Sequence, residues 1–508
     1  MKVVLVGVPY INTRIPPLSI ALLAGHLRQN DFEVASVDLN IEAYKAAPED
    51  LKKYWKMTQG FQWAEKDIFD AILFPRLVEP NLGGWVSMIL EHKPDVVGIS
   101  ATASPMAKII GRQIRQRSPQ VKIIYGGPTC SKFYGDDSYK DPTVSDAVVD
   151  GEGEETLLDL MNKYRDHGEF VPVPGASVYY QGQFVDGGFR PGVKDLDSLA
   201  PPDFEDFDLA DYTDEDSYGG KKEFLEVPVY SSRGCVAKCH FCMDYKMWQS
   251  YRFKSAKAFV QELKYLRDKY GAGQYFFVEL LFNGSHKWVR EYAAEMKKEG
   301  LHFPFHSHGR ISKNMTPELL RNLREVGLFH LNYGLESASD KVLKLMTKGY
   351  GYREASRCII DTHNAGISMS INLVIGYPGE TTKEWLKTLW FIIRHRKFIN
   401  SKPNMAICDV IPGADLHQNP EKFGITFDPK DPYFFSNWQT IDGKNTFKVR
   451  KFRRDIMDYV FSRIRFHEYY RERDRLRGQN KTGDKSLGRL LKKLYIAQPR
   501  RHDSPGLK

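Results

Sequence analysis

The sequence predicts an α/β protein built in three main parts. Residues 1–165 alternate short apolar runs with helical patterns, which is typical of a doubly wound, Rossmann-like sheet. Residues 227–425 repeat the alternation on a longer period, which predicts a partial (β/α)6 barrel. Residues 426–508 are basic and are expected to form a mainly helical C-terminal extension. Residues 166–226, rich in Pro, Gly, Asp and Tyr, are expected to connect sheet and barrel and to hold one hairpin.

Five short strands and three helices are predicted in the first part. Short strands separated by helices imply parallel pairing, with helices on both faces of the sheet. The strands are expected at 2–8, 33–38, 95–100, 121–125 and 147–149, and the helices at 17–28, 106–117 and 154–164.

The loops that follow these strands are small, glycine-rich or hydroxyl-bearing. In a doubly wound sheet, ligands bind beyond the carboxyl ends of the strands, and such loops let a large flat ligand approach the backbone closely. Ordinary turn chemistry explains each loop alone, but four of them on one edge favour a binding site. The candidate contacts are Pro9, Tyr10, Ser100, Ser104, Gly126, Gly127, Pro128, Gly151, Glu152 and Gly153.

Six strands are predicted in the second part. They are expected at 228–231, 275–281, 304–308, 330–334, 370–375 and 405–410, with helices at 256–270, 287–299 and 317–325. Six such units make an incomplete barrel, and barrel enzymes place their chemistry at the carboxyl ends of the strands. The segment after the first of these strands is therefore a candidate active site.

That segment holds Cys235, Cys239 and Cys242, spaced C-x-x-x-C-x-x-C. Three thiolates on one short loop can hold three irons of a [4Fe–4S] cluster and leave the fourth iron open to a small molecule. A structural zinc site is an alternative, but it needs a fourth ligand. His240 lies between two of the cysteines, where a short loop would struggle to wrap four ligands around one ion. Packing is the other alternative, and three thiols cannot all be paired in disulfides.

The composition is that of a globular protein. Hydrophobic residues make up 42% and aromatic residues 13% of the chain, and no apolar run approaches the roughly 20 residues that span a bilayer. The first residues are too short a run for a signal peptide and are interpreted as a buried strand. A cytoplasmic enzyme is therefore expected, and that compartment suits reduced thiols and an oxygen-sensitive cluster.

The net charge of +9 comes from the C-terminal part. Residues 431–508 contain 20 Lys and Arg against 9 Asp and Glu, so the rest of the chain is close to neutral. Such a run is typical of a solvated helix face, with a phosphate- or carboxylate-bearing partner as the alternative, and no nucleic-acid motif is recognised. Apolar residues at helical spacing among arginines predict an amphipathic helix that caps the barrel and bounds the substrate pocket. They are Ile456, Val460 and Ile464 among Arg453, Arg454, Arg463 and Arg465.

Several motifs carry a resemblance to a known family. Phe241 stands directly before the last cysteine of the loop. Further matches are GLES at 334–337, MTKG at 346–349 and IGYPGET at 375–381, and in the first part PPLS at 16–19, GGP at 126–128 and GEGE at 151–154. Over roughly residues 1–425 the chain resembles the radical S-adenosylmethionine (SAM) enzymes that carry a cobalamin-binding domain before the barrel.

The resemblance implies three cofactors: a [4Fe–4S] cluster on the cysteine loop, SAM on its open iron, and cobalamin at the edge of the first sheet. One electron from the cluster would split SAM into methionine and a deoxyadenosyl radical. The family motifs also imply contacts to SAM. Phe241 would pack by the adenine, Glu279 would meet the methionyl ammonium, Arg310 the methionyl carboxylate and Glu336 the ribose hydroxyls, with Gly376 as a further contact. Leu280 departs from the pattern, because the family often has a second acid there.

The function implied by the resemblance is methyl transfer. The substrate would be an unactivated carbon, or phosphorus, of a small molecule or natural product, and methylcobalamin would deliver the methyl group. The alternatives are a non-methylating enzyme of cyclisation or rearrangement, a cluster- or cobalamin-based sensor, and a zinc-knuckle nucleic-acid protein. The resemblance also implies an external one-electron reductant of the flavodoxin or ferredoxin type. We expect a monomer with no membrane span and no nucleic-acid partner.

One match to a cobalamin motif is rejected on its position. Residues 361–366 read D-x-H-x-x-G, the pattern by which some cobalamin proteins place a histidine on cobalt. Here it ends a predicted barrel helix, with Gly366 as the terminating glycine. The loop after the first strand, where the motif belongs, has no histidine in residues 7–12. The lower face of the cobalt is therefore expected to be empty or to hold water.

Overall fold

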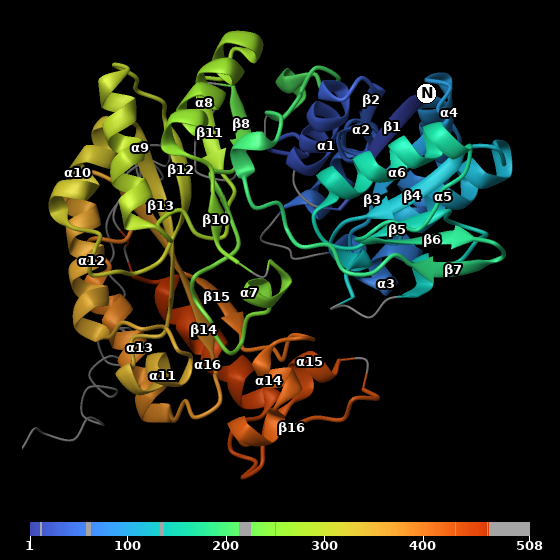
Figure 1. Cartoon of the computed structure of the whole chain (residues 1–508). Helices are drawn as coiled ribbons and strands as arrows, with labels where there is room; N and C mark the ends of the chain where they lie inside the picture. Colours follow the sequence, from blue (N-terminus) through green and yellow to red (C-terminus); the bar gives the residue numbers. More distant parts are fainter. Residues whose placement is uncertain are drawn as a thin grey trace, which may run out of the picture.

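The structure is a computed structural model of the 508-residue chain. It describes residues 1–10, 13–56, 62–132, 137–212, 225–248, 250–431, 433–464 and 466. Arg465 and the basic stretch from residue 467 onward lie outside the described residues. Figure 1 shows the first sheet with its helices on the right, the barrel on the left and the C-terminal part below. In the described part of the chain, no helix is long and apolar enough to cross a membrane.

The first part is a seven-stranded sheet in the order β2-β1-β3-β4-β5-β6-β7. Strands β1 to β5 pair in parallel, which confirms the predicted doubly wound sheet, and β6 and β7 add an antiparallel hairpin. The hairpin lies in the segment that we assigned to the connector, so the sheet continues past residue 165 to residue 186. The strands are β1 Lys2–Gly7, β2 Glu33–Asp38, β3 Val96–Ser100, β4 Lys122–Gly126, β5 Ala147–Val149, β6 Ala176–Tyr180 and β7 Gln183–Asp186.

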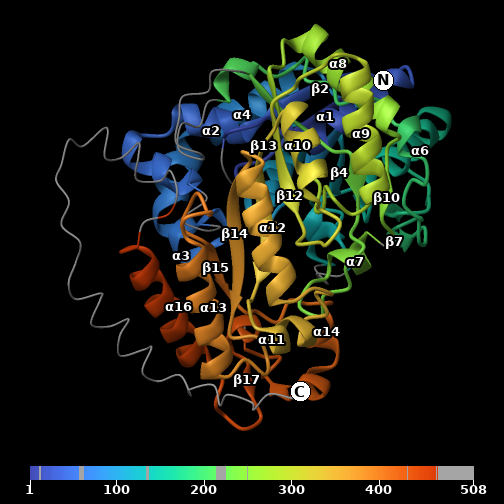
Figure 2. The same cartoon turned by 90° about the vertical axis from the view of Figure 1, so that its left-hand side faces the viewer.

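Helices cover both faces of this sheet (Figure 2). Val3 and Leu5 of β1 share a core with α1 and α6, whereas Val4 and Val6 point to the opposite face and share a core with α4 and α5. The sequence predicted three helices here and no element between residues 39 and 94. The structure has α1 Leu18–Gln29, α2 Leu39–Ala46, η1 Glu49–Trp55, η3 Gln62–Ala64, α3 Lys66–Ile68, the π-helix η4 Phe69–Val78, α4 Glu79–Glu91, α5 Met106–Arg117, η5 Pro128–Cys130, η6 Asp137–Tyr139 and α6 Gly153–His167.

The second part is a curled six-stranded parallel sheet in the order β15-β14-β13-β12-β11-β8. All six predicted strands are present, so the partial barrel is confirmed. The strands are β8 Glu226–Val229, β11 Gln274–Phe277, β12 Phe305–Gly309, β13 Leu328–Glu336, β14 Ser368–Ile375 and β15 Asn404–Ile407. The helices are α8 Ala256–Tyr270, α9 His286–Lys298, α10 Pro317–Glu325, α11 Asp340–Leu345, α12 Tyr352–Asn364 and α13 Thr382–His395. The remaining elements are η7 Leu196–Ser198, η8 Leu209–Asp211, the short pair β9 Ser232–Arg233 and β10 Arg252–Phe253, and α7 Asp244–Met247.

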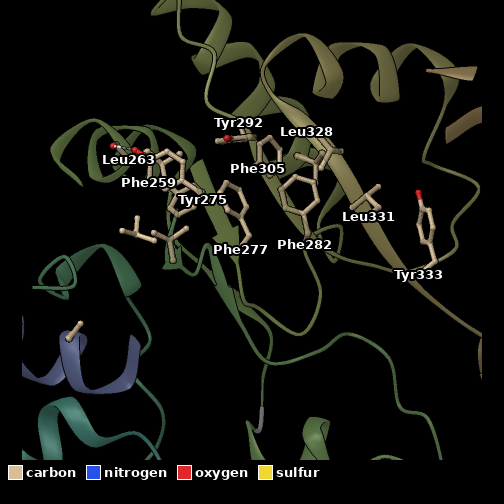
Figure 3. Close-up of a cluster of buried hydrophobic side chains, with 14 of the residues drawn as sticks. Phe259, Leu263, Tyr275, Phe277, Phe282, Tyr292, Phe305, Leu328, Leu331 and Tyr333 are labelled. Carbon is tan, nitrogen blue, oxygen red and sulfur yellow. Dashed lines mark hydrogen bonds between the residues drawn. The ribbon is translucent and has the colours of Figure 1, made fainter. Parts of the chain in front are cut away.

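Aromatic side chains fill the space between the barrel sheet and its helices (Figure 3). Phe277 of β11 and Phe305 of β12 stack with ring centroids 4.4 Å apart, and Phe259 of α8 meets Phe277 edge-on at 5.0 Å. These rings are fully buried. Burial of one such side chain stabilises the fold by about 1.5–3 kcal/mol. The aromatic core therefore fixes the strands that carry the site residues at their carboxyl ends.

The described C-terminal part is mainly helical, as predicted, and its longest helix packs on the barrel. Helix α16 lies against β14, β15 and α13. Val460 is buried on this helix, which agrees with the predicted amphipathic pattern, but Arg453 is buried as well and pairs with Glu380 at 3.2 Å. The expectation that its arginines face solvent is therefore wrong for Arg453. The elements are α14 Asp415–Gln418, η9 Pro420–Phe423, β16 Ile425–Thr426, α15 Phe434–Asn437, β17 Gln439–Thr440 and α16 Phe447–Phe461.

Candidate active site

The cysteine loop lies between β9 and α7, where the first part, the barrel and the C-terminal part meet (Figure 1). Cys239 is buried, Cys235 and Cys242 are half-buried, and all three thiols are free. Backbone N–H groups already point at two of them. Ala237 N–H donates to Cys235 Sγ and Asp244 N–H donates to Cys242 Sγ, each at 3.4 Å. Donors of this kind stabilise a thiolate, which is the form that binds a metal.

The surroundings of the thiols fit a [4Fe–4S] cluster. Burial raises the pKa of all three thiols, and the charges of Arg310 and Lys348 oppose that effect at Cys235 and Cys239. Among the described residues, no group of three or more His, Cys, Asp or Glu side chains is placed to hold one metal ion. A four-iron cluster needs no such group, because each cysteine binds a different iron. Cys235 and Cys239 lie near two cations, which suit an anionic cluster, whereas the Cys242 thiol donates to Asp244 Oδ2 at 3.1 Å.

Lys348 is the site residue that sequence reasoning missed. Its Nζ lies 3.3 Å from Oε1 of Glu336 and 5.9 Å from the ring centroid of Phe241, and both side chains of the ion pair are largely buried. Arg310 donates from Nη2 to the backbone oxygen of Lys348. The structure thus brings together Phe241, Arg310 and Glu336, which the family resemblance predicted as SAM contacts. The MTKG motif contains Lys348 and is the sequence signal that could have identified it.

Glu336 is held in an unusual backbone conformation. Its φ is +59°, in the left-handed region that favours glycine, and the register of β13 against β14 shifts between Gly334 and Glu336. Tyr350 donates its hydroxyl to the backbone oxygens of Gly334 and Leu335, both at 2.9 Å, and so supports the bulge. A left-handed non-glycine residue of this kind costs about 1–3 kcal/mol, and such strain clusters at functional sites.

Glu279 lies beneath the start of the cysteine loop. Ser231 donates its hydroxyl to Glu279 Oε1 at 2.9 Å, and the side chain is 4% exposed. Burial raises the pKa of this carboxyl to about 7. Leu280, the departure from the family pattern, is exposed. The one remaining carboxylate is therefore placed at the loop, and a cation beside it would favour its charged form.

Gly376 uses both of its backbone polar groups within the protein. Its N–H donates to Glu380 Oε2 and its carbonyl accepts from Asn445 Nδ2, each at 2.8 Å. Its φ is +82°, and a Cβ at this position would collide with the side chain of Arg450. The glycine is therefore needed for the packing of α16, and its role as a SAM contact stays a prediction.

The register of the first sheet gathers the predicted cobalamin loops on one edge. Gly7 lies opposite Ser100, and Ser100 lies opposite Gly126, so the carboxyl ends of three adjacent strands form one row. Gly127 follows with φ +108°, and a Cβ there would lie 2.6 Å from the oxygen of Ala101. Only glycine fits this close approach.

The other predicted contacts on this edge differ in what they do within the protein. Pro9 is buried, and the Tyr10 N–H donates to Asn40 Oδ1 at 3.1 Å. Ser104 is buried and accepts from the Met106 N–H at 3.3 Å, at the start of α5. Pro128 and Gly151 are exposed, Gly153 is half-buried, and nothing lies within 4 Å of a Cβ built on Gly151. The Glu152 side chain instead forms ion pairs with two arginines of the barrel.

The face of the barrel sheet opposite the helices is lined by polar groups, and His306 on this face contacts the buried ion pair of Glu226 and Arg14. His306 and His308 alternate with buried Phe305 and Ser307 on β12, and Asn332 and His330 occupy the same face of β13. Burial lowers the pKa of His308 to about 4 and that of His330 to about 3, so both imidazoles are neutral at neutral pH. Asn332 Oδ1 is buried without a hydrogen-bond partner among the described residues. This face can therefore exchange hydrogen bonds with a ligand, and the charges beside His306 are balanced within the Glu226–Arg14 ion pair.

His363, the histidine of the rejected cobalt motif, lies near the carboxyl end of α12 and contacts the ring of Phe398 at 5.3 Å. Gly366 follows with φ +74°, as expected of a helix-terminating glycine. The segment precedes the amino end of β14, whereas the cysteine loop follows the carboxyl end of β8. The motif therefore ends a barrel helix in the structure, which is the reason for which it was rejected as a cobalt-binding motif.

Residues 229–392 match the model of the Radical SAM superfamily, so this segment is a radical SAM domain. The chain is 25% identical over 307 residues to an uncharacterized methyltransferase of Pyrococcus horikoshii, which covers 60% of this chain and 65% of that protein. It is 26% identical over 337 residues to the anaerobic magnesium-protoporphyrin IX monomethyl ester cyclase of Rubrivivax gelatinosus. This match covers 64% of this chain and 58% of that protein. The chain thus spans less than two thirds of the length of either relative.

The fold is similar to that of TsrM from Kitasatospora setae, a radical S-adenosylmethionine methyltransferase whose structure was solved with cobalamin and a [4Fe–4S] cluster bound. The TM-score is 0.60 at 14% identity, and the match covers 85% of this chain and 78% of that chain. The match includes both parts of the molecule. The chain therefore has the fold of a cobalamin-dependent radical SAM enzyme.

Proposed function

We propose that the protein is a cobalamin-dependent radical SAM methyltransferase. The observation that carries the proposal is the contact between its two sheets. Arg233, two residues before Cys235, forms ion pairs with Glu152 of the loop after β5 and with Glu154 at the start of α6. This contact holds the cysteine loop against the carboxyl edge of the first sheet, as an enzyme that uses a cluster and cobalamin together requires.

Named side chains would hold the cofactors. Cys235, Cys239 and Cys242 would bind the cluster, and the edge loops of the first sheet would bind cobalamin. When bound, the cofactors supply one-electron cleavage of SAM and transfer of its methyl group. The protein orients SAM: Arg310 and Lys348 would bind its carboxylate, and Glu336 would accept from its ribose hydroxyls.

The substrate would be a small molecule that carries hydrogen-bonding groups. The neutral imidazole of His308 and the oxygen of Asn332, which has no hydrogen-bond partner among the described residues, support this, because they can donate to and accept from a ligand. A one-electron reductant of the flavodoxin or ferredoxin type would reduce the cluster. A cytoplasmic monomer remains our expectation.

Anaerobic reconstitution tests the proposal. The full chain would be loaded with iron, sulfide and hydroxocobalamin, reduced, and given SAM. We expect two products, 5′-deoxyadenosine and S-adenosylhomocysteine, with the second dependent on cobalamin. The variant Cys239→Ala should lose 5′-deoxyadenosine, while Cys358→Ala, a buried cysteine outside the loop, should keep both products. Absence of both products from the reconstituted parent would contradict the proposal.

A second candidate is a cobalamin-dependent enzyme that catalyses cyclisation or rearrangement. The similarity to the Rubrivivax cyclase favours it. The two candidates differ in what happens to the methyl group of SAM. A methyltransferase forms S-adenosylhomocysteine, whereas a non-methylating enzyme forms 5′-deoxyadenosine alone. The ratio of these products, measured by mass spectrometry in one reaction, separates them.

A further inference from the structure

Four buried charged side chains cross the boundary between the first sheet and the barrel. Glu152 and Glu154 come from the loop after β5 and the start of α6, and Arg233 and Arg252 come from the paired strands β9 and β10. Each of the four side chains is between 7% and 10% exposed. The two positive and two negative charges balance. We call these four residues the interdomain clamp.

The clamp consists of two bidentate ion pairs that are linked by one further hydrogen bond. Arg233 donates to both oxygens of Glu154, and Arg252 donates to both oxygens of Glu152. Arg233 Nη1 also donates to Glu152 Oε2 at 2.9 Å, which links the two pairs. Bidentate pairs fix the relative orientation of their partners as well as their distance.

Electrostatics keep the clamp charged. Burial alone would raise the pKa of Glu154, but the charge and hydrogen bonds of Arg233 outweigh it and hold that pKa below its usual range. The charge of Glu154 likewise holds the pKa of Arg233 above its usual value in spite of burial. Removal of either partner would leave the other buried and unpaired.

The clamp is connected to the cysteine loop by a single residue. Gly234 separates Arg233 from Cys235, and its φ is +85°. A Cβ at Gly234 would collide with the backbone oxygen of Ser250, so this turn has little freedom. A shift of Arg233 is therefore passed directly to the first cysteine of the loop.

We infer that the interdomain clamp positions the cysteine loop relative to the first sheet, and that Glu152 and Glu154 are positioning residues rather than cofactor contacts. The inference rests on the proposed function, because it assigns the GEGE segment the task of setting the distance between the cluster and cobalamin. It replaces the role that the sequence gave to Glu152. The first sheet would thereby set the position of the cysteine loop through its own salt bridges, in addition to binding a cofactor.

Hydrogen exchange of the cofactor-free full chain tests the inference without any activity. The variants are Glu154→Gln, Arg233→Lys and Gly192→Ala. The last removes no charge: a Cβ at Gly192 would lie 2.5 Å from Arg252 Nη1 and 2.7 Å from Glu152 Oε1, so its methyl group pushes the pair apart. We expect the amides of residues 235–243 to exchange about tenfold faster in each variant.

Two matched controls keep the result specific. Glu262→Gln breaks a buried ion pair with Lys254 that lies within the barrel. Glu155→Gln removes the charge of the half-buried neighbour of Glu154, and Glu155 pairs with His26 at 3.5 Å. Both should leave exchange in residues 235–243 at the parent rate. Equal exchange in the clamp variants and the parent, or equal acceleration in Glu262→Gln, would overturn the inference.

A distance measurement then connects the clamp to its proposed task. Pulsed electron paramagnetic resonance on the reconstituted protein would measure the separation of the reduced cluster and cob(II)alamin. We expect a narrow distance distribution in the parent and a broader one in Arg233→Lys. A broad distribution in the parent as well would overturn the inference. Because the exchange experiment needs no cofactor, failure of reconstitution refutes only the proposed function.

Discussion

Nδ1 of His240 lies 2.7 Å from Oδ2 of Asp415, which ties the cysteine loop to the C-terminal part of the chain. The same carboxylate pairs with Lys246 at 2.7 Å and accepts from the Tyr245 hydroxyl at 3.0 Å. His240 is the residue that a zinc site on this loop would need, but no group of three or more His, Cys, Asp or Glu side chains in the described ranges could hold one metal ion. The loop is thus held from two sides, by the interdomain clamp and by Asp415.

Loss of Asp415 should loosen the cysteine loop. Asp415→Ala removes the acceptor shared by His240, Lys246 and Tyr245, and we expect the cluster to be lost roughly tenfold faster to a chelator. The measurement is iron content against time. Asp442→Asn, which alters an exposed carboxylate that accepts from Thr440, is the matched control. Equal iron loss in the two variants would contradict the proposed role of Asp415.

Lys348 should contribute to SAM binding. Lys348→Met keeps the length of the side chain but removes the charge near Glu336, Phe241 and Cys239, and we expect about tenfold weaker binding, equivalent to about 1.4 kcal/mol. Equilibrium dialysis with labelled SAM on the cluster-loaded protein measures it. Lys344→Met, an exposed lysine of α11, should bind as the parent does. An unchanged affinity in Lys348→Met would remove this lysine from the site.

The position of Lys348 illustrates what the sequence could and could not predict. Buried strands and amphipathic helices were predictable because their periodicity is local, and α5, α8 and α10 have the expected bounds. The segment between residues 39 and 94 was not predictable in this way, because its π-helix η4 contains Pro75 and follows neither the α-helical nor the β-strand period. Lys348 looked like one charge among many until the fold placed it beside Glu336.

Ion pairs between residues far apart in the sequence were the other feature that the sequence could not predict. Glu152 stands in a loop after a strand, where a carboxylate serves equally well as a cofactor contact or as an ion-pair partner. Its partner Arg252 is 100 residues away in sequence, so no local pattern connects the two. The same holds for Arg453, whose buried pair with Glu380 contradicts the solvated face that its helix pattern predicted.

Glu279 should make stability depend on pH. Its carboxyl has a pKa of about 7 in the folded protein, above the 4.5 of an unperturbed glutamate, so the folded state binds its proton more tightly. The contribution of this proton to the free energy of unfolding is present in full below pH 4.5 and is lost as pH rises through 7. The loss is about 3 kcal/mol.

The variant Glu279→Gln isolates this effect. Denaturant unfolding of the cofactor-free protein at pH 5 and pH 8 gives the change in free energy of unfolding for parent and variant. We expect the parent to lose more stability than the variant between the two values. A difference of the opposite sign would show that Glu279 is charged in the folded protein.

The cobalt should receive no protein nitrogen on its lower face. The segment after β1 has no histidine in residues 7–12, and His363 lies near the carboxyl end of α12. The electron paramagnetic resonance spectrum of bound cob(II)alamin should therefore lack nitrogen splitting, in the parent and in His363→Ala alike. Splitting that disappears in His363→Ala would restore the rejected motif.

The most direct measurement of the central claim follows the methyl group itself. The reconstituted, reduced protein would be given SAM with a deuterated methyl group, and its cobalamin would be recovered and weighed by mass spectrometry. The account predicts deuterated methylcobalamin together with S-adenosylhomocysteine. Formation of 5′-deoxyadenosine with no label on cobalamin would contradict methyl transfer and favour a non-methylating radical enzyme.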